Sequence, residues 1–173
     1  MSEPINECWR SIDGYLNYQV SNIGRVRNCD TGRILRGTID HHGYNIVSLS
    51  KDRAKRKIPV HRLVAHEFIP NESDKPFVDH IDTNKLNNCV TNLRWATNRE
   101  NQGNSIKQSD RSSIYKGVYY DRSRRKWMAR ITIHGTMVNL GRYQTEVEAA
   151  RAYNAKALEV FGEFAKLNEI SEG

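Results

Sequence analysis

Phe77-Val78-Asp79-His80, followed by Asn92-Leu93-Arg94-Trp95 and then by Asn101, is the stretch that decides the fold of this chain. An apolar run ends in an acidic residue beside a histidine, a loop rich in Asp and Asn follows, and a short apolar segment returns. Thr97 and Glu100 then form the pattern of a capping box, which predicts a helix with Asn101 in its early turns. We therefore expect two short strands and a helix around one polar site.

The residue types at this site suit the hydrolysis of a phosphodiester. One hard divalent cation can neutralise charge on the phosphate and help the leaving oxygen. Asp79 and Asn101 offer a carboxylate and an amide oxygen, which suit Mg²⁺ or Mn²⁺, and Asn98 is the alternative ligand on the helix. His80 has an ordinary pKa near neutrality, so we predict that it takes the proton from the attacking water. Because neighbouring strand residues point to opposite faces, Asp79 and His80 can share a site only at a strand end or where the strand twists.

Charge is distributed unevenly along the chain of 173 residues, which has a formal net charge of +7 and is 38% hydrophobic. So low a hydrophobic content favours several small modules over one large core. Residues 113–145 carry seven basic side chains and one acidic one, whereas residues 146–173 carry three basic and six acidic ones. This pattern predicts surfaces that face nucleic acid.

Other features argue against several classes of protein. No apolar run is long enough to cross a membrane, and Met1-Ser2-Glu3-Pro4 lacks the basic start and apolar stretch of a signal peptide. The cysteines Cys8, Cys29 and Cys89 are far apart and form no C-x-x-C pair, so no structural zinc is expected. We expect a reduced intracellular protein.

The segments around the site have strand and helix patterns of their own. Residues 8–50 read as short strands and turns and residues 51–57 as a basic turn. Residues 58–68 follow, with Leu63, Val64 and Phe68 at helical spacing, and Pro70 closes this element. Residues 105–112 are a polar linker. Three alternating strands follow over residues 115–120, 126–134 and 136–143. Thr145 and Glu148 then begin a helix that runs to Phe161 and stops at Gly162.

Residues 58–104 resemble the HNH homing endonucleases of phage introns. The matching pieces are Val60-His61-Arg62-Leu63-Val64-Ala65, Val78-Asp79-His80-Ile81-Asp82, Asn87-Asn88 and Asn92-Leu93-Arg94-Trp95. The resemblance implies a ββα-metal fold in which Asp79 and Asn101 bind the metal, His80 is the general base and Asn92 braces the loop. His61 and His66 could be mistaken for a metal pair, but packing or DNA contact is the favoured role of His61.

The two flanking segments also resemble DNA-binding modules. Residues 9–49, with Tyr18-Gln19-Val20-Ser21-Asn22 and Gly24-Arg25-Val26, resemble the nuclease-associated modular domain. Residues 113–170, with Tyr115-Lys116-Gly117-Val118 and Leu140-Gly141-Arg142-Tyr143, resemble the DNA-binding domain of plant ethylene-response (Apetala-type) factors, in which a three-stranded sheet lies in the major groove. The residues predicted to contact DNA are His61, Arg62, Arg94, Arg25, Arg27, Lys116, Arg122, Arg124, Arg125, Lys126, Arg130, Thr132 and Arg142.

Together these features predict a modular α+β protein: a nuclease-associated module over residues 1–55, an HNH domain over 56–104, a linker over 105–112 and an ethylene-response-factor type domain over 113–170. The predicted function is a metal-dependent endonuclease that binds double-stranded DNA site-specifically as a monomer and nicks one strand. The resemblance implies a homing or free-standing phage nuclease, which acts in the cytoplasm of the host. An inert sequence-specific DNA-binding regulator and an RNA-processing protein are the alternatives.

Overall fold

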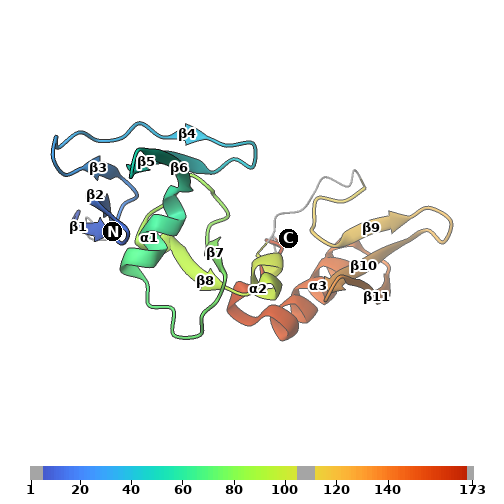
Figure 1. Cartoon of the computed structure of the whole chain (residues 1–173). Coiled ribbons are helices and arrows are strands. Elements are labelled where there is room, and N and C mark those ends of the chain that lie inside the picture. Colours follow the sequence, from blue (N-terminus) through green and yellow to red (C-terminus); the bar gives the residue numbers. More distant parts are fainter. Residues whose placement is uncertain (1–5, 105–111, 171–173) are drawn as a thin grey trace. The chain divides into compact units, whose positions relative to one another are not determined.

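The computed structural model describes residues 6–104 and 112–170, and shows small antiparallel sheets with a few helices (Figure 1). The predicted α+β class is confirmed. The chain forms two compact units, Met1–Ala96 and Thr97–Gly173, which we call the first and second unit. The predicted linker 105–112 lies outside the described residues except for Ser112. No helix in the described part of the chain is long and apolar enough to cross a membrane.

The first unit begins with two three-stranded antiparallel sheets. One sheet has the order β1-β2-β3 and the other the order β4-β5-β6. Their strands are β1 (Trp9–Ile12), β2 (Tyr15–Ser21), β3 (Val26–Asn28), β4 (Thr38–Ile39), β5 (Asn45–Lys51) and β6 (Ala54–Pro59). The β-rich segment predicted for residues 8–50 is therefore confirmed. The basic stretch 51–57, expected as a turn, is instead mostly strand, because Asp52 and Arg53 alone turn the chain with positive φ angles of 50° and 63°.

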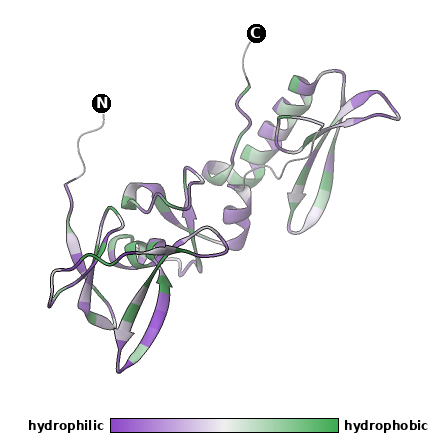
Figure 2. Cartoon of the chain, turned by 90° about the horizontal axis from the view of Figure 1, so that it is seen from above, coloured by the Kyte–Doolittle hydropathy of each residue, from purple (hydrophilic) through white to green (hydrophobic). Residues whose placement is uncertain are grey.

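Helix α1 (Val60–Phe68) follows directly and packs against both sheets. Its residues Leu63 and Val64 are buried, as their spacing predicted, and Ile69 ends the helix by donating its N–H to the carbonyl of Ala65. Figure 2 shows hydrophobic and hydrophilic residues mixed along the same strands, in keeping with sheets that each bury one face. The core of this unit joins buried side chains from six strands and this helix, among them Ile12, Val20, Val26, Val47, Leu49, Val60, Val64, Val78 and Trp95.

The nuclease-like hairpin closes the first unit. Strands β7 (Phe77–His80) and β8 (Leu93–Ala96) pair in antiparallel fashion, with Asp79 opposite Arg94 and His80 opposite Leu93. Asn92 was expected to open the return strand. It lies instead at the end of the 3₁₀ turn η1 (Val90–Asn92), where its backbone leaves its side chain free to reach back into the loop.

The second unit combines a short helix with a sheet that is covered by a longer helix. Its elements are α2 (Asn98–Gly103), β9 (Val118–Asp121), β10 (Lys126–Ile133), β11 (Thr136–Tyr143), α3 (Glu146–Phe161) and the 3₁₀ turn η2 (Gly162–Phe164). Both predicted capping boxes are present, with Thr97 and Glu100 on α2 and with Thr145 and Glu148 on α3. The sheet has the order β11-β10-β9, and Val118 and Ala129 pack against Ala149 and Ala150 of α3.

A β-bulge interrupts the pairing of β10 with β11. Ala129 lies opposite Gly141, but the next residue, Arg130, lies opposite Asn139, so Leu140 is the extra residue. Residues directly opposite one another share a face of an antiparallel sheet. The bulge therefore brings Arg142, which lies opposite Met128, onto the same face as Asn139 and Arg130, away from α3.

Candidate active site

Asp79 and His80 come from the last two positions of β7, where the chain turns into the Asp- and Asn-rich loop. Both side chains are buried, at 4% and 5% exposure. Ile81 then leaves the strand by donating its N–H to the carbonyl of Asn92. The strand end is one of the two places at which neighbouring residues were expected to share a site.

Arg94 lies next to the Asp79 carboxylate. Its Nε donates to Asp79 Oδ2 at 2.9 Å, across the register pair that joins β7 and β8. A buried carboxylate is tolerated when a cation compensates its charge, so the ion pair with Arg94 offsets part of the cost of burying Asp79. The sequence assigned Arg94 to DNA contact, and its pairing with Asp79 was not foreseen.

His80 is held by Asn88, a residue to which the sequence assigned no role. The Oδ1 atom of Asn88 lies 3.1 Å from His80 Nε2, while Asn88 Nδ2 donates to the carbonyl of Leu86 at 3.4 Å. With its amide oriented in this way, Asn88 accepts a hydrogen bond from the Nε2–H of His80. Burial lowers the pKa of His80, and the bond to Asn88 opposes this shift. The imidazole is therefore neutral near pH 7 and can accept a proton.

Asn88 is itself supported by the N-terminal part of the first unit. Gly24 has a φ of +83°, and a Cβ atom built on it would lie 2.7 Å from the Cβ of Asn88. Beside this contact, Val90 donates its N–H to the carbonyl of Asn22 at 2.8 Å. A side chain at position 24 would push the loop away. Glycine therefore allows the close approach that places Asn88 in contact with His80.

The rings of His61 and Tyr44 lie beside His80. The ring of His61 on α1 lies 5.1 Å from that of His80, edge to face, and 4.7 Å from the ring of Tyr44. His61 is 7% exposed, its Nδ1 has no hydrogen-bond partner, and burial lowers its pKa to about 3. The structure thus places His61 in packing contact with the site, whereas His66 packs edge-on against Trp95.

Asn92 lies at the centre of the loop's hydrogen bonds. Its Oδ1 accepts the N–H of Asp82 at 3.0 Å, and its Nδ2 donates to Asp82 Oδ1 and to the carbonyl of Asn87, both at 2.9 Å. Asp82 also accepts from the backbone of Asn84 and the side chain of Asn87, and these amide bonds lower its pKa against the effect of burial. The loop between β7 and β8 is therefore fixed by its own side chains.

Asn101 lies on α2 in the second unit and is partly exposed, and the rival ligand Asn98 is exposed on the same helix. That Asn101 and Asp79 bind the same metal ion stays a prediction. The donors suit a hard cation, because the buried Asp79 carboxylate and an asparagine amide both offer oxygen. Among the residues that the structure describes, no group of three or more His, Cys, Asp or Glu could hold a metal ion.

The predicted DNA contacts of the first unit are engaged within the protein. Arg25 forms a salt bridge with Glu7, and its Nε lies 2.8 Å from the Glu7 carboxylate. The guanidinium of Arg27 lies 4.3 Å from the centre of the Trp9 ring and donates twice to Gln19. Arg62 donates to the carbonyl of Pro76 at 3.4 Å. Each of these arginines keeps a partly or fully exposed side chain, so a second contact to phosphate is sterically open.

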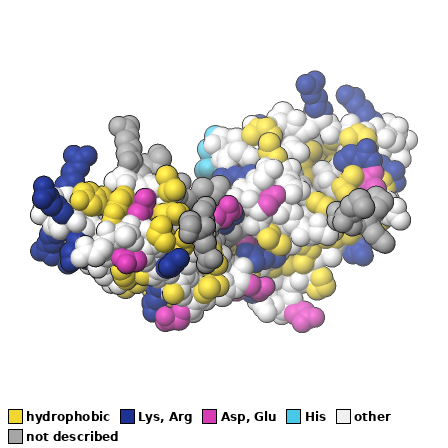
Figure 3. Space-filling model, turned by 180° about the vertical axis from the view of Figure 1, so that it is seen from behind, with side chains coloured by type: hydrophobic (Ala, Val, Ile, Leu, Met, Phe, Trp, Pro, Cys, Tyr) yellow, Lys and Arg dark blue, Asp and Glu magenta, His cyan; other side chains and the backbone are white. Residues whose placement is uncertain are grey.

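In the second unit, most of the predicted DNA contacts gather on the sheet face away from α3 and on the β9–β10 turn. Arg122, Arg124 and Arg125 are exposed on that turn. On the sheet, Arg130 lies 4.2 Å from the ring of Tyr119, and Thr132 is exposed. Lys126 begins β10, and Arg142 forms a salt bridge with Asp121 at 3.7 Å. Figure 3 shows Lys and Arg side chains gathered over this sheet.

Lys116 differs from the other predicted DNA contacts. It precedes β9, is only partly exposed, and donates from Nζ to the carbonyl of Gly103 at 3.0 Å. Burial lowers its pKa to about 8. Lys116 thus contributes to the packing of the unit and lies before the first strand of the sheet, and its contact with DNA stays a prediction.

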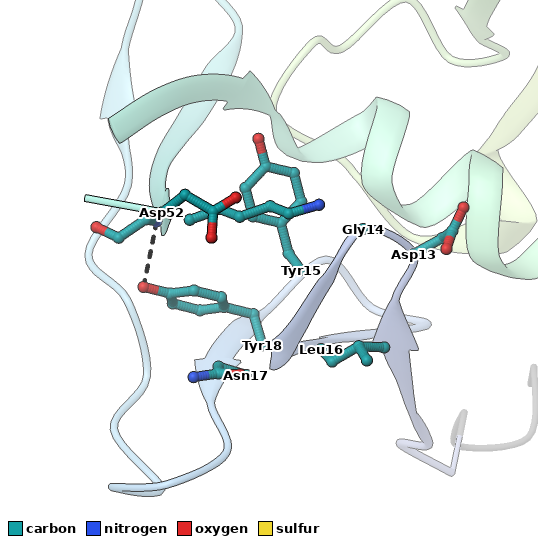
Figure 4. A pocket seen from close by; sticks show the side chains of 9 residues that line it. Asp13, Gly14, Tyr15, Leu16, Asn17, Tyr18 and Asp52 are labelled. Atoms are coloured by element: carbon teal, nitrogen blue, oxygen red, sulfur yellow. Dashed lines mark hydrogen bonds between the residues drawn. The ribbon is translucent and has the colours of Figure 1, made fainter. Parts of the chain in front are cut away.

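A pocket of the first unit lies elsewhere. It is lined by Asp13–Tyr18 and Ser50–Asp52, and Figure 4 shows Tyr18 closing one side, with its hydroxyl accepting the N–H of Ser50 at 3.3 Å. Neither Asp79 nor His80 lines it, so this pocket is separate from the residues described above.

Comparison with known proteins identifies two family models along the chain. One, described as the NUMOD4 motif, matches residues 7–50, and the other, described as HNH endonuclease, matches residues 59–102. The second match contains Asp79, His80, Asn92 and Asn101.

Several viral proteins are similar to the chain. DNA endonuclease I-HmuI of Bacillus phage SP01 is 41% identical over 99 residues, which are 57% of this chain and 57% of that protein. The uncharacterized HNH endonuclease L245 of Acanthamoeba polyphaga mimivirus is 39% identical over 105 residues, 61% of this chain and 32% of the relative. Protein 3.8 of Escherichia phage T7 is 31% identical over 90 residues, 52% of this chain and 74% of the relative. The chain thus spans about a third to a little over half of the first two relatives.

A solved structure described as DNA binding and cleavage by the HNH homing endonuclease I-HmuI is also similar. It is 43% identical, covers 52% of each chain and has a TM-score of 0.49.

Proposed function

Because the chain belongs to the HNH endonuclease family, we propose that it is a metal-dependent DNA endonuclease that hydrolyses a phosphodiester bond. The observation that carries this proposal is the buried pair at the end of β7. A carboxylate compensated by Arg94 lies beside a neutral imidazole whose Nε2 is already bonded to Asn88. Burying a carboxylate and an imidazole costs free energy, and few purely structural roles require two such buried groups next to one another.

In the proposed mechanism, His80 accepts a proton from a water molecule as that water attacks the phosphorus. Asn88 holds Nε2 and thereby fixes the orientation of the ring. Asp79 and Asn101 would hold Mg²⁺ or Mn²⁺, and the ion, when bound, supplies charge to the phosphate and to the leaving oxygen. The P–O bond to the leaving deoxyribose oxygen breaks, that oxygen takes up a proton from solvent, and the proton on His80 is released to solvent.

The flanking segments would hold the DNA duplex. In the second unit, Arg130, Thr132 and Arg142 share the face that α3 leaves uncovered, which supports a sheet that docks in a groove as in the ethylene-response factors. In the first unit, Arg25, Arg27 and Arg62 would contribute phosphate contacts, as would His61 and Arg94 near the cut. The four segments predicted from the sequence would thus serve as an N-terminal DNA-binding module, the nuclease, a linker and a C-terminal DNA-binding module.

With one such site per chain, a monomer would nick one strand of its target. Relatives encoded by phages and a giant virus support a mobile-element origin, with a homing or free-standing nuclease acting inside the infected host cell.

A plasmid-nicking assay tests the function. The wild-type protein should convert supercoiled DNA to open circles with Mg²⁺ or Mn²⁺, and His80→Ala should lower the rate by about 100-fold or more with DNA affinity retained. Arg122→Ala is the matched control, because it should weaken DNA binding but leave the rate at saturating DNA unchanged. A wild-type protein that binds DNA and never nicks would instead be the inert regulator, and stronger competition by duplex RNA than by duplex DNA would point to RNA processing.

A further inference from the structure

Helix α2 carries the proposed metal ligand Asn101, yet it is too short to be stable by itself. It spans six residues, Asn98–Gly103, whereas isolated helices shorter than about 12 residues are marginal in water. The Thr97 capping box satisfies its first N–H groups. Its last carbonyls need partners from elsewhere.

Those partners come from residues far along the chain in the second unit. The carbonyl of Gly103 accepts from Lys116 Nζ at 3.0 Å and from the backbone N–H of Lys166 at 3.1 Å. Arg99, on the first turn of α2, donates to the carbonyl of Val160 at 2.9 Å. Both ends of α2 are therefore tied to the C-terminal module.

A close side-chain contact completes this attachment. Gly103 is buried, and a Cβ atom built on it would lie 2.7 Å from Cγ and 2.8 Å from Cβ of Phe161. Phe161 is the last residue of α3 and is 8% exposed. The ring thus lies directly on the backbone of α2, and only glycine at position 103 allows that approach.

We propose that the C-terminal module is a structural part of the nuclease, in which Phe161 and Lys116 are positioning residues that hold α2 and thereby place Asn101 for metal binding. This inference rests on the proposed function, in which Asn101 is a metal ligand. It gives the module a second task beside holding DNA. It also gives a reason for the bond between Lys116 Nζ and the carbonyl of Gly103 at the end of α2.

The test uses the full chain with Phe161→Ala and Lys116→Met. Leu158→Ala is the matched control for the first, because it also shortens an apolar side chain of α3 but at a position that is 50% exposed. Hydrogen exchange is measured at the amides of Asn101 and Asn104, which donate to Thr97 and Glu100. The rate of nicking at saturating DNA is measured over a range of Mn²⁺ concentrations.

Both variants should raise the exchange rate of these two amides by about 10-fold and raise the Mn²⁺ concentration for half-maximal nicking several-fold. DNA affinity should be unchanged for Phe161→Ala. High Mn²⁺ should restore most of the rate, which it would not do for protein that is simply unfolded. Phe161→Leu, a milder change, should give intermediate values if Phe161→Ala fails to fold. Leu158→Ala should behave as wild type.

Faster exchange in α2 with an unchanged Mn²⁺ dependence would overturn the inference, because α2 would then be loosened without consequence for the metal. Unchanged exchange would overturn it as well. Failure of the proposed function has a different signature: the wild-type protein itself would not nick, while the exchange experiment would still report whether Phe161 and Lys116 hold α2.

Discussion

The two regions that carry the proposed site residues are built in different ways. Around His80, the β7–β8 loop is bonded mainly to itself through Asn92 and Asp82, and residues within twelve positions supply most partners. Around Asn101, the helix depends on Lys116, Phe161 and Lys166, which follow it by 15 to 65 residues. The first region is stabilised mainly by local contacts, whereas the second depends on a distant module. Single substitutions should therefore affect one region without affecting the other.

The largest effect on this comparison should come from Asn92→Ala. The change removes three hydrogen bonds of the loop and leaves Asp82 short of partners, so the first unit should lose about 3 kcal/mol of stability. Urea unfolding followed by hydrogen exchange can resolve the units, with β7 and β8 amides losing protection. Amides of β10 in the second unit serve as the internal reference. Equal loss in both units would show that the β7–β8 loop is not independent.

Asn88→Ala tests the difference between the two regions, because it should lower the nicking rate more than it lowers the stability of the first unit. The change frees His80 Nε2 and removes the group that fixes the orientation of the ring, so the nicking rate should fall by roughly 10–100-fold. DNA affinity and the Mn²⁺ dependence should stay as in wild type, whereas Phe161→Ala should shift the Mn²⁺ dependence. Gly24→Ala, which pushes on Asn88 from the N-terminal side, should lower the rate in the same way. A shift in Mn²⁺ dependence for Asn88→Ala would mean that the two regions are not separable.

A smaller effect concerns pH and the first unit alone. Burial lowers the pKa of His61 to about 3 in the folded protein, against an ordinary value of 6.5. Between these values the unfolded chain binds a proton that the folded chain does not, so this contribution to stability is complete above pH 6.5 and is lost as the pH falls. The loss is about 1.4 kcal/mol per pH unit, or about 2 kcal/mol between pH 6.5 and pH 5.

His61→Gln provides the control, because glutamine cannot take up the proton. Its free energy of unfolding should fall less steeply between pH 6.5 and pH 5 than that of wild type, as measured by urea titrations followed through tryptophan fluorescence. Parallel pH profiles for the two proteins would contradict the burial of a neutral His61.

Local patterns predicted much of this molecule. Alternation placed the strands of the C-terminal sheet, and the spacing of Thr and Glu placed the starts of α2 and α3. The Asp79–His80 pair was visible because both residues are neighbours in the chain. Each of these signals depends on residues a few positions apart, which is the range over which the backbone periodicity acts.

What the sequence could not show depends on contacts between distant residues or on irregular backbone. No pattern marks the bulge at Leu140, although it decides which face carries Arg142. Asn88 stood in a recognised motif, but only the folded loop brings its amide to His80. Lys116 was assigned to DNA because basic residues near a sheet usually face outward, and its bond to the Gly103 carbonyl was not foreseeable.

The glycine at position 103 has a consequence for anyone who exchanges parts between such proteins. A cut within residues 105–111 looks natural, since it separates two sequence modules, but it would strip Phe161, Lys116 and Lys166 from the helix that they hold. A chimera joined at Ala96 and Thr97 keeps that helix with its supports. Grafting a new targeting domain onto this chain would therefore succeed only when α2 is exchanged together with the domain, or when the new domain is redesigned to pack against the backbone of Gly103.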